Sequence, residues 1–470
     1  MNNGPVRVLV LADTDSYVKW GAALADQFPG NWHVELVLAR STAMPSSAQL
    51  ADALAGTSSV GREPEVVGLH ELRRRLTEAT PDVLVLAARG WTVQAAVSVV
   101  ENVPTRPVIV TGLPGVGVPV LPYGLGFRRA ADVFVVHSRR EVREFQHAAQ
   151  RLDLPNRFEL ARLPYLERTP RPGVAGRRRG HHRRGALVFA AQALVPGTRG
   201  ERVRLVERLA AVARSEPDRE VVIKVRARTG ETQTHHEQVP FEQIVASLPH
   251  RPNNLVVRTG PMHEHIADAS GFVTVSSTAL LEAVSVGVPA IALDDFGVGV
   301  SQINLALEGS GLLGSTADLM AGRFGSPRPQ WCADNYFHDP AEDTWLPRVT
   351  TLVRQRRAGG LSPYPELPGS WRSGMRDVLY RHFAFVDGSS GPDDRSVVAA
   401  VAERRVALGA LWLNQRRSRL LSSVLPTPRG AAAREFAEQN SRTAPGVPGP
   451  ERPGVDEAPE PTSWERLKVS

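Results

Sequence analysis

The chain has 470 residues, of which 42% are hydrophobic and 22% charged, so as a whole it is neither fibrous nor disordered. At roughly 100 to 200 residues per domain, this length gives about two to four domains. A single cysteine, Cys332, excludes an internal disulfide, and no cluster of Cys and His fits a structural zinc site. No apolar run reaches about 18 residues and no charged leader precedes the first strand pattern, so we expect a soluble cytoplasmic protein.

The net charge of +7 comes almost entirely from arginine. Lys19, Lys224 and Lys468 are the only lysines among 56 basic residues, and the 40 Gly and 37 Pro also indicate a compositional bias. The densest basic run, Arg177–Arg184, lacks the interleaved aromatic residues of a base-stacking surface. We therefore expect no nucleic-acid partner, although the isoelectric point is near 10.0.

The first half of the chain alternates short apolar runs with helical patterns, which indicates an α/β domain around a parallel sheet. The run Val83–Ala87 is apolar on both faces, as in a central strand. The expected helices include Val18–Gln27, Leu72–Glu78 and Arg140–Arg151. The expected strands are Val6–Leu11, His33–Leu38, Glu65–Leu69, Val83–Ala87, Pro107–Thr111 and Val133–His137.

A Pro-, Gly- and Arg-rich stretch without periodicity then separates this half from a second α/β pattern. The expected strands of the second pattern are Ala186–Ala191, Glu220–Val225, Asn254–Thr259, Gly271–Val275 and Pro289–Leu293. Its expected helices are Arg199–Arg214, Met262–Asp268 and Thr278–Val286. The sequence thus predicts two Rossmann-like domains.

Further helices are expected at Ser373–His382 and Val397–Leu421, and the Pro-, Gly- and Glu-rich end of the chain predicts a disordered tail. The predicted organisation is an N-terminal domain (1–167), a basic linker (168–185), a C-terminal domain (186–361), a helical region (362–440) and the tail (441–470).

Two common nucleotide-binding motifs are missing. The turn after the first strand, Ala12–Tyr17, contains no Gly, which argues against a dinucleotide-dependent oxidoreductase. Neither Lys19 nor Lys224 follows a Gly, so there is no phosphate-binding loop of the ATPase type. The Gly-rich segment Gly112–Pro119 follows a later strand and fits either a tight turn or a loop that faces the acceptor.

The most specific local pattern is residues 271–293. A strand there delivers Ser276, Ser277 and Thr278 to the start of a helix, where free backbone N–H groups favour an anion such as phosphate. The hydroxyls could instead cap the helix. Glu282 lies four residues after Thr278 on the same helical face, placed to accept hydrogen bonds from ribose hydroxyls or to face solvent. Gly287 is expected at the C′ position of the helix.

Residues 274–291 resemble the donor-binding segment of GT-B-fold glycosyltransferases and of their relatives, the non-hydrolysing sugar-nucleotide epimerases. The nearest resemblance is to bacterial capsule-type and polysialyl-type transferases and to actinobacterial glycosyltransferases of unassigned substrate. It implies two Rossmann-like domains facing a cleft, with the phosphates at the hydroxyl-rich turn and the ribose at Glu282. The His-Pro pair of the capsule-type and polysialyl-type enzymes is missing after Val225, which leaves the nucleotide open.

Other residues at the carboxyl ends of the second domain's strands are further donor-binding candidates, because ligands bind at that edge of a parallel sheet. Lys224 and Arg226 would be phosphate partners. The remaining candidates by position are Gln192, Arg199 and Gly260.

The resemblance places the catalytic base in the first domain, and the sequence offers three residues for it. Asp13 and Asp15 follow the first strand, and either one could be the base or, for Asp15, a helix cap. His137 ends the last expected strand and is a third candidate. No cofactor or metal is expected, although Asp13-Thr14-Asp15 would question the fold if it bound a cation.

The sequence therefore predicts a metal-independent glycosyltransferase that moves a sugar from a nucleotide-sugar to a saccharide or lipid-linked acceptor in cell-surface polysaccharide or glycoconjugate synthesis. The alternatives are a sugar-nucleotide epimerase of the same fold and a non-catalytic nucleotide- or polyanion-binding protein. Contact with the inner membrane face is expected to be peripheral at most, through Arg177–Arg184 and Val397–Leu421.

Overall fold

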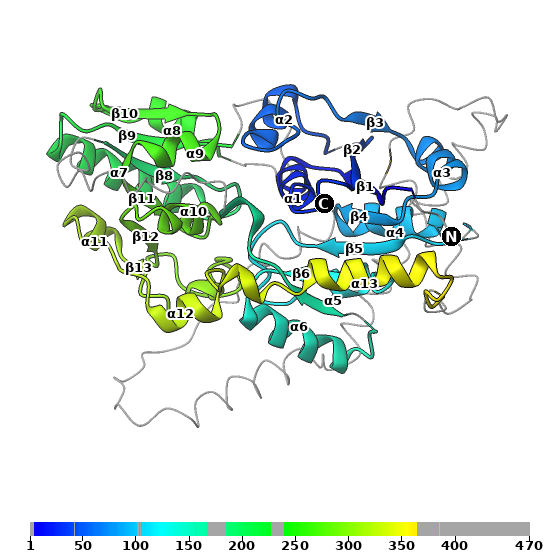
Figure 1. The fold of residues 1–470 in the computed structure, drawn as a ribbon. Helices are drawn as coiled ribbons and strands as arrows, with labels where there is room; N and C mark the ends of the chain where they lie inside the picture. The colour runs from blue at the N-terminus through cyan, green and yellow to red at the C-terminus, as the bar shows by residue number, and fades with distance from the viewer. Residues whose placement is uncertain are drawn as a thin grey trace, which may run out of the picture.

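The computed structural model describes residues 4–41, 43–100, 103, 105–155, 157–166, 185–226, 239–363 and 385. Within these ranges the chain forms two parallel sheets, each flanked by helices (Figure 1). The expected linker, the helices Ser373–His382 and Val397–Leu421, the tail and the basic run Arg177–Arg184 lie outside the described residues, apart from Gly185. Among the described helices, none is long and apolar enough to cross a membrane.

The first sheet has seven strands in the order β3-β2-β1-β4-β5-β6-β7, and every neighbouring pair is parallel. Six of them are the predicted strands to within two residues, and β7 was not predicted. Their bounds are β1 Arg7–Ala12, β2 His33–Ala39, β3 Glu65–Val67, β4 Val83–Ala87, β5 Val108–Gly112, β6 Val133–Val136 and β7 Phe158–Leu160.

The second sheet has six strands in the order β10-β9-β8-β11-β12-β13, also parallel throughout. Five were predicted and the short β13 was not. Their bounds are β8 Ala186–Ala190, β9 Val221–Lys224, β10 Leu255–Arg258, β11 Ala269–Thr274, β12 Ala290–Leu293 and β13 Leu313–Gly314.

Successive residues of a strand point to opposite faces of the sheet. Because the central strands are apolar on both faces, helices cover both faces of each sheet. In β1, Val8 and Val10 belong to one apolar cluster and Leu9 and Leu11 to another. The helices before β8 are α1 Asp15–Ala25, α2 Ser47–Leu54, α3 Leu69–Glu78, α4 Gly90–Val100, α5 Pro122–Gly126, α6 Arg139–Arg151 and the 3-10 turn η1 Pro164–Leu166. Those after it are α7 Arg199–Ser215, α8 Phe241–Ala246, α9 Met262–Ala267, α10 Ala279–Ser285, η2 Leu305–Leu307, α11 Thr316–Met320, α12 Pro329–Asp334, η3 Pro340–Glu342 and α13 Trp345–Arg357.

The last described helix, α13, returns to the first domain. The sequence assigns residues up to 361 to the second domain, but Trp345, Val349 and Leu352 are buried in the apolar cluster of the first sheet. Figure 1 shows α13 in yellow along the cyan strands β5 and β6. Sequence periodicity cannot reveal this crossing, because the strands that receive the helix lie more than 200 residues earlier in the chain.

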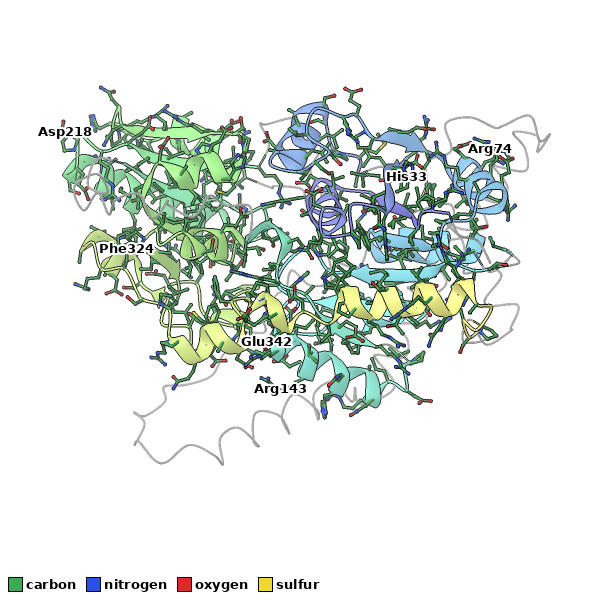
Figure 2. All side chains as sticks on the ribbon, in the orientation of Figure 1. His33, Arg74, Arg143, Asp218, Phe324 and Glu342 are labelled. Atoms are coloured by element: carbon green, nitrogen blue, oxygen red, sulfur yellow. The ribbon has the colours of Figure 1, made fainter. Side chains whose placement is uncertain are left out.

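Ion pairs fix both ends of this returning segment. At its end, Arg356 and Arg357 of α13 bond the buried carboxylate of Asp82, which precedes β4, each at 2.7 Å. At its beginning, Arg143 of α6 pairs with Asp334 of α12 at 2.6 Å, and Arg139 of α6 pairs with Glu342, on the side of the molecule where Figure 2 labels Arg143 and Glu342.

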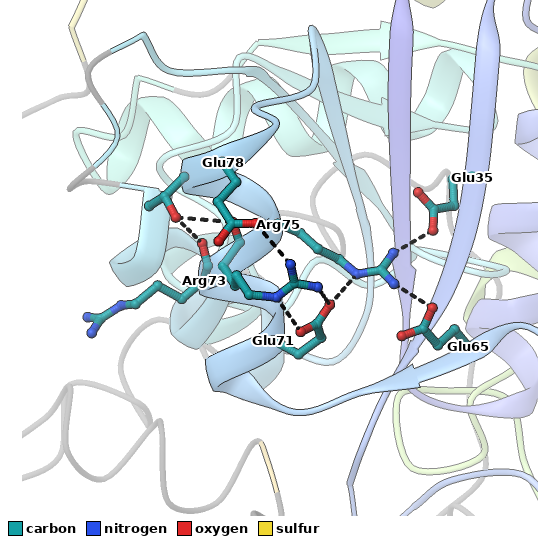
Figure 3. A network of polar contacts seen from close by, with 8 residues as sticks. Glu35, Glu65, Glu71, Arg73, Arg75 and Glu78 are labelled. Atoms are coloured by element: carbon teal, nitrogen blue, oxygen red, sulfur yellow. Dashed lines mark hydrogen bonds and ion pairs between the residues drawn. The ribbon is translucent and has the colours of Figure 1, made fainter. Parts of the chain in front are cut away.

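Another network holds α3 against the edge of the first sheet (Figure 3). Arg75 of α3 reaches Glu35 of β2, Glu65 of β3 and its own helix neighbour Glu71. Hydrogen bonds from Arg74 and Arg75 hold the pKa of Glu71 at about 2. This network lies at the edge strand β3, on the side of the first domain that faces away from the second domain (Figure 1).

Candidate active site between the two domains

Each sheet has a point where the strand order reverses, and ligands of parallel sheets bind at the carboxyl end of such a point. In the first sheet it lies between β1 and β4, and in the second between β8 and β11. Asp13 and Asp15 follow β1, Gln192 follows β8 and Ser276 follows β11. Side chains from the two reversal points meet where the domains touch.

Among the described residues, only one of the two carboxylate oxygens of Asp13 has hydrogen-bond donors. Its side chain is fully buried, and Oδ2 accepts hydrogen bonds from the backbone N and Nε of Arg89 (3.1 and 2.9 Å) and from Oγ1 of Thr92 (2.8 Å). Oδ1 is also buried, but no hydrogen-bond donor among the described residues reaches it. A buried carboxylate oxygen without a donor is unusual and needs an explanation.

Asp15 lies at the domain contact. Its Oδ2 is 3.4 Å from Nε of Arg226, which follows β9 of the second domain. Nη2 of the same arginine donates to Oγ of Ser16 at 3.3 Å. The carboxylate that the sequence proposes as base and the cation that it proposes as phosphate partner are therefore neighbours.

A second ion pair crosses the same contact. Nζ of Lys19 in α1 lies 2.7 Å from Oε1 of Glu282 in α10, and the same ammonium group lies 4.3 Å from the ring centre of Tyr165. Glu282 is only 4% exposed, so the alternative of a solvated Glu282 does not hold. No hydrogen bond from the described residues reaches Oε2 of Glu282.

Two hydroxyl groups of the turn before α10, those of Ser276 and Ser277, already form hydrogen bonds within the protein. The amide oxygen of Gln192 accepts from the backbone N of Ser276 at 2.8 Å, and its amide nitrogen donates to the Ser276 hydroxyl at 2.8 Å. Oγ of Ser277 accepts from the backbone N of Ala279 at 3.3 Å, which is the capping alternative. Thr278 makes no such cap bond. Gly287 takes a φ of +79° just after the helix, as expected for a C′ residue.

Lys224 ends β9 inside the domain contact. Burial lowers its pKa to about 8, and the nearby charges of Arg226 and Lys19 act in the same direction, while Asp52 and Glu282 oppose them. Within the described ranges its ammonium group has no hydrogen bond or ion pair. Burial likewise raises the pKa of Asp52 on α2. Lys224 is therefore a cation without a fixed partner among the residues that the structure describes.

The remaining predicted residues are placed differently. Arg199 is exposed at the first residue of α7. Gly260 follows β10 with a φ of +106°, next to His265. His137 is 1% exposed, accepts from Nε1 of Trp20 at 2.8 Å and donates from Nδ1 to the carbonyl of Ala161 at 2.9 Å. Burial lowers its pKa to about 4, so His137 serves the core and we do not propose it as the base.

The two carboxylates of Asp13-Thr14-Asp15 have different partners, Arg89 and Arg226. No group of three or more His, Cys, Asp or Glu side chains that could hold a metal occurs in the part of the chain that the structure describes.

Residues 8–352 match the model of a family described as "Putative glycosyltransferase (DUF6716)". The chain belongs to this family. Its sequence matches none of the curated proteins.

Solved structures with a similar backbone include two classes of sugar-nucleotide enzyme. A UDP-GlcNAc 2-epimerase from Neisseria meningitidis bound to UDP-GlcNAc is 11% identical, with 75% of this chain and 100% of that chain covered and a TM-score of 0.48. A UDP-glucosyltransferase from Polygonum tinctorium that glucosylates indoxyl is 14% identical, with 76% and 95% covered and a TM-score of 0.39. Two parallel-sheet Rossmann-like domains in a chain of this family confirm the predicted GT-B fold class.

Sequence reasoning missed several residues of this contact between the two domains. Arg89 and Thr92 hold Asp13, and Lys19 and Tyr165 surround Glu282. The sequence could have indicated Lys19, because this residue lies four residues after Asp15 and therefore on the same helical face. Arg89, Thr92 and Tyr165 had none, because only the tertiary fold brings them to their partners.

Proposed function

We propose that this protein transfers a sugar from a nucleotide-sugar donor to a hydroxyl group of an acceptor. The observation that carries the proposal is the contact between Asp15, at the reversal point of the first sheet, and Arg226, which follows β9 beside the reversal point of the second sheet. It joins a carboxylate that could accept the acceptor's proton to a cation that could hold the donor's phosphate.

In this proposal the second domain binds the donor. Lys224 and Arg226 hold the phosphate groups, because both are cations at the carboxyl end of β9 and Lys224 has no partner in the described chain. Gln192, which is bonded to Ser276 of the hydroxyl-rich turn, follows β8, the strand next to β9. Oε2 of Glu282 accepts from a ribose hydroxyl, while Oε1 stays with Lys19.

The first domain binds the acceptor. Asp15 takes the proton of the acceptor hydroxyl, whose oxygen forms a bond to the anomeric carbon of the sugar. The bond from that carbon to the phosphate oxygen breaks, and the nucleotide leaves with the bonding electrons. Lys224 and Arg226 neutralise the charge that develops on the leaving phosphate, so the mechanism uses no metal ion.

Donor binding is tested by thermal shift with UDP, CMP, CDP, GDP and dTDP and their sugar conjugates. A ligand at 100 times its Kd stabilises the folded state by about 2.7 kcal/mol, which is easily measured. We expect one nucleotide to shift the wild type and to shift Lys224→Ala and Glu282→Gln much less. Arg323→Ala, which removes an exposed arginine that follows α11, is the matched control and should respond like the wild type.

Turnover is tested with the nucleotide-sugar found in that screen, with and without saccharide or lipid-linked acceptors. Asp15→Asn should bind the nucleotide but transfer sugar at least about 100-fold more slowly, as for loss of a general base. If Asp13→Asn loses turnover and Asp15→Asn does not, the base is Asp13. Conversion of the donor without any acceptor would identify an epimerase, and failure of every nucleotide to bind would favour a non-catalytic protein.

We also propose that the reaction serves cell-surface polysaccharide or glycoconjugate synthesis in the cytoplasm, with peripheral membrane contact if the acceptor is lipid-linked. Flotation with anionic liposomes at low salt tests the contact. Protein that stays at the bottom of the gradient would exclude it.

A further inference from the structure

The Gly-rich loop after β5, residues 113–119, has no role in the function proposed above. It belongs to the first domain, yet it lies against the turn that begins α10 in the second domain. Three contacts determine where the loop lies.

The first contact is with Glu141, which is 1% exposed at the start of α6. Its Oε1 accepts from the backbone N of Gly117 at 2.7 Å and from the hydroxyl of Tyr336 at 2.8 Å. Its Oε2 accepts from the backbone N of His137 at 2.7 Å. A buried carboxylate with this many donors fixes the loop to α6 and to the segment that returns from the second domain.

The second contact is with Tyr165, where the chain leaves the first domain. Its hydroxyl donates to the carbonyl of Pro114 at 3.2 Å. The ring of the same tyrosine lies under Lys19, which pairs with Glu282. The position of the loop is therefore tied to the carboxylate that we propose for the donor ribose.

The third contact is between Gly115 and Thr278. A Cβ atom added at Gly115 would lie 2.9 Å from Oγ1 of Thr278 and 3.8 Å from its Cβ. The first distance is too short for a carbon–oxygen contact, so a side chain at position 115 would displace the loop or turn the Thr278 hydroxyl away. Glycine therefore allows the loop and the turn to approach this closely without moving the Thr278 hydroxyl.

We propose that Gly115 is a positioning residue for sugar transfer: by leaving room for Thr278, it sets the separation at which the acceptor domain meets the donor. This inference rests on the proposed glycosyltransferase function. Glu141 and Tyr165 hold the loop, and Gly115 is the point at which the loop contacts the donor-binding turn.

A cross-link tests the contact without any substrate. The Cβ separation of 3.8 Å matches the mean for a disulfide, so Gly115→Cys/Thr278→Cys in a Cys332→Ser background should oxidise to an intramolecular disulfide. Gly124→Cys/Thr278→Cys is the control, because position 124 has no atom within 4 Å of an added Cβ, and it should stay reduced. A Gly115/Thr278 pair that stays reduced would overturn the proposal.

Kinetics test the role. Gly115→Ala should lower kcat by about 10- to 100-fold, as expected for a displacement on the order of 1 Å, and leave the nucleotide thermal shift unchanged. Gly124→Ala, which introduces a Cβ into open space, should have wild-type kcat. In Gly115→Ala/Thr278→Ala the combined loss should be smaller than the product of the single losses, because removing the Thr278 hydroxyl relieves the overlap.

The outcomes separate the two proposals. A wild-type kcat in Gly115→Ala, or losses that simply multiply in the double variant, would overturn the role of Gly115 and leave the transferase intact. A wild-type protein that transfers no sugar with any donor it binds would overturn the proposed function, and the role of Gly115 with it.

Discussion

Two buried carboxylates stand at opposite ends of the central strand pair of the first domain. Asp82 precedes β4 and Asp13 follows β1, and the two strands are direct neighbours. Both oxygens of Asp82 are bonded: Oδ1 by Arg356 and Arg357, and Oδ2 by Arg357 and the backbone N of Arg7. Asp13 has a bonded Oδ2 and a buried Oδ1 that no described donor reaches.

We propose that the difference separates a structural carboxylate from one that is left available to a ligand. A group selected for stability alone is expected to have its hydrogen-bonding capacity filled, because an unpaired buried oxygen costs about 1 to 3 kcal/mol. Asp82 satisfies that expectation and fastens the returning helix α13. Asp13 does not, and it lies at the end of the sheet where we place the chemistry.

The largest effect should come from Asp82→Asn. The amide nitrogen of the new asparagine is a donor and would have to face an arginine or a backbone N–H, which are donors too. In addition, two partly buried arginines would lose the negative charge that they pair with. We expect the free energy of unfolding to fall by about 3 kcal/mol, measured by urea denaturation. Glu78→Gln, an exposed change on α3, is the control. A loss below about 1 kcal/mol would show that α13 is held by its apolar contacts alone.

Lowering the pH should weaken the same bonds between Asp82 and α13 in the wild type. Burial alone would raise the pKa of Asp82, but the hydrogen bonds from Arg357 and the backbone of Arg7 and the charge of Arg356 lower it overall. Because the folded pKa is depressed, the stabilisation is complete above the unfolded pKa of about 3.9 and is lost as the pH falls through the folded value. The urea midpoint should therefore drop more steeply below about pH 4 in the wild type than in Asp82→Asn, and parallel curves would contradict this.

Asp13→Asn should be milder. Its amide oxygen can occupy the bonded Oδ2 position and its nitrogen the Oδ1 position, where no described donor is lost. We expect a destabilisation of about 1 kcal/mol, from the weakened bond to Arg89. If urea denaturation finds a loss as large as that of Asp82→Asn, the two carboxylates are both structural and the comparison fails.

The smallest effect on stability should come from Glu282→Gln, which leaves the partly exposed Lys19 ammonium group solvated. The Lys19–Glu282 pair joins the two domains, but the lysine side chain is 34% exposed, so solvent screens much of the interaction. We expect a change below about 1 kcal/mol, and a still smaller difference from the wild type in 1 M salt. A larger loss would mean that this pair holds the domains together as firmly as Asp82 holds α13.

Much of the fold could be predicted, because local pattern determines it. Strands such as Val83–Ala87 are continuous apolar runs, and the hydroxyl-rich turn before α10 lies at the strand end where the sequence placed it. The position of Asp13 and Asp15 at the carboxyl edge followed from the same pattern.

What could not be predicted depends on contacts between distant residues. His137 ends its strand as expected, but only the fold shows Trp20 and Ala161 occupying its two nitrogens. The pairing of Lys19 with Glu282 joins residues 263 positions apart. Periodicity carries no information about which distant groups meet.

The return of α13 to the first sheet also has a consequence for how the chain is made. The apolar face of the first sheet is completed by Trp345, Val349 and Leu352, which a ribosome synthesises only after the whole second sheet. During synthesis, this part of the first domain's core therefore stays exposed to water until the second domain and α13 have been made. A gene truncated before residue 345 would leave that face permanently uncovered, which is a hazard for aggregation rather than merely for activity.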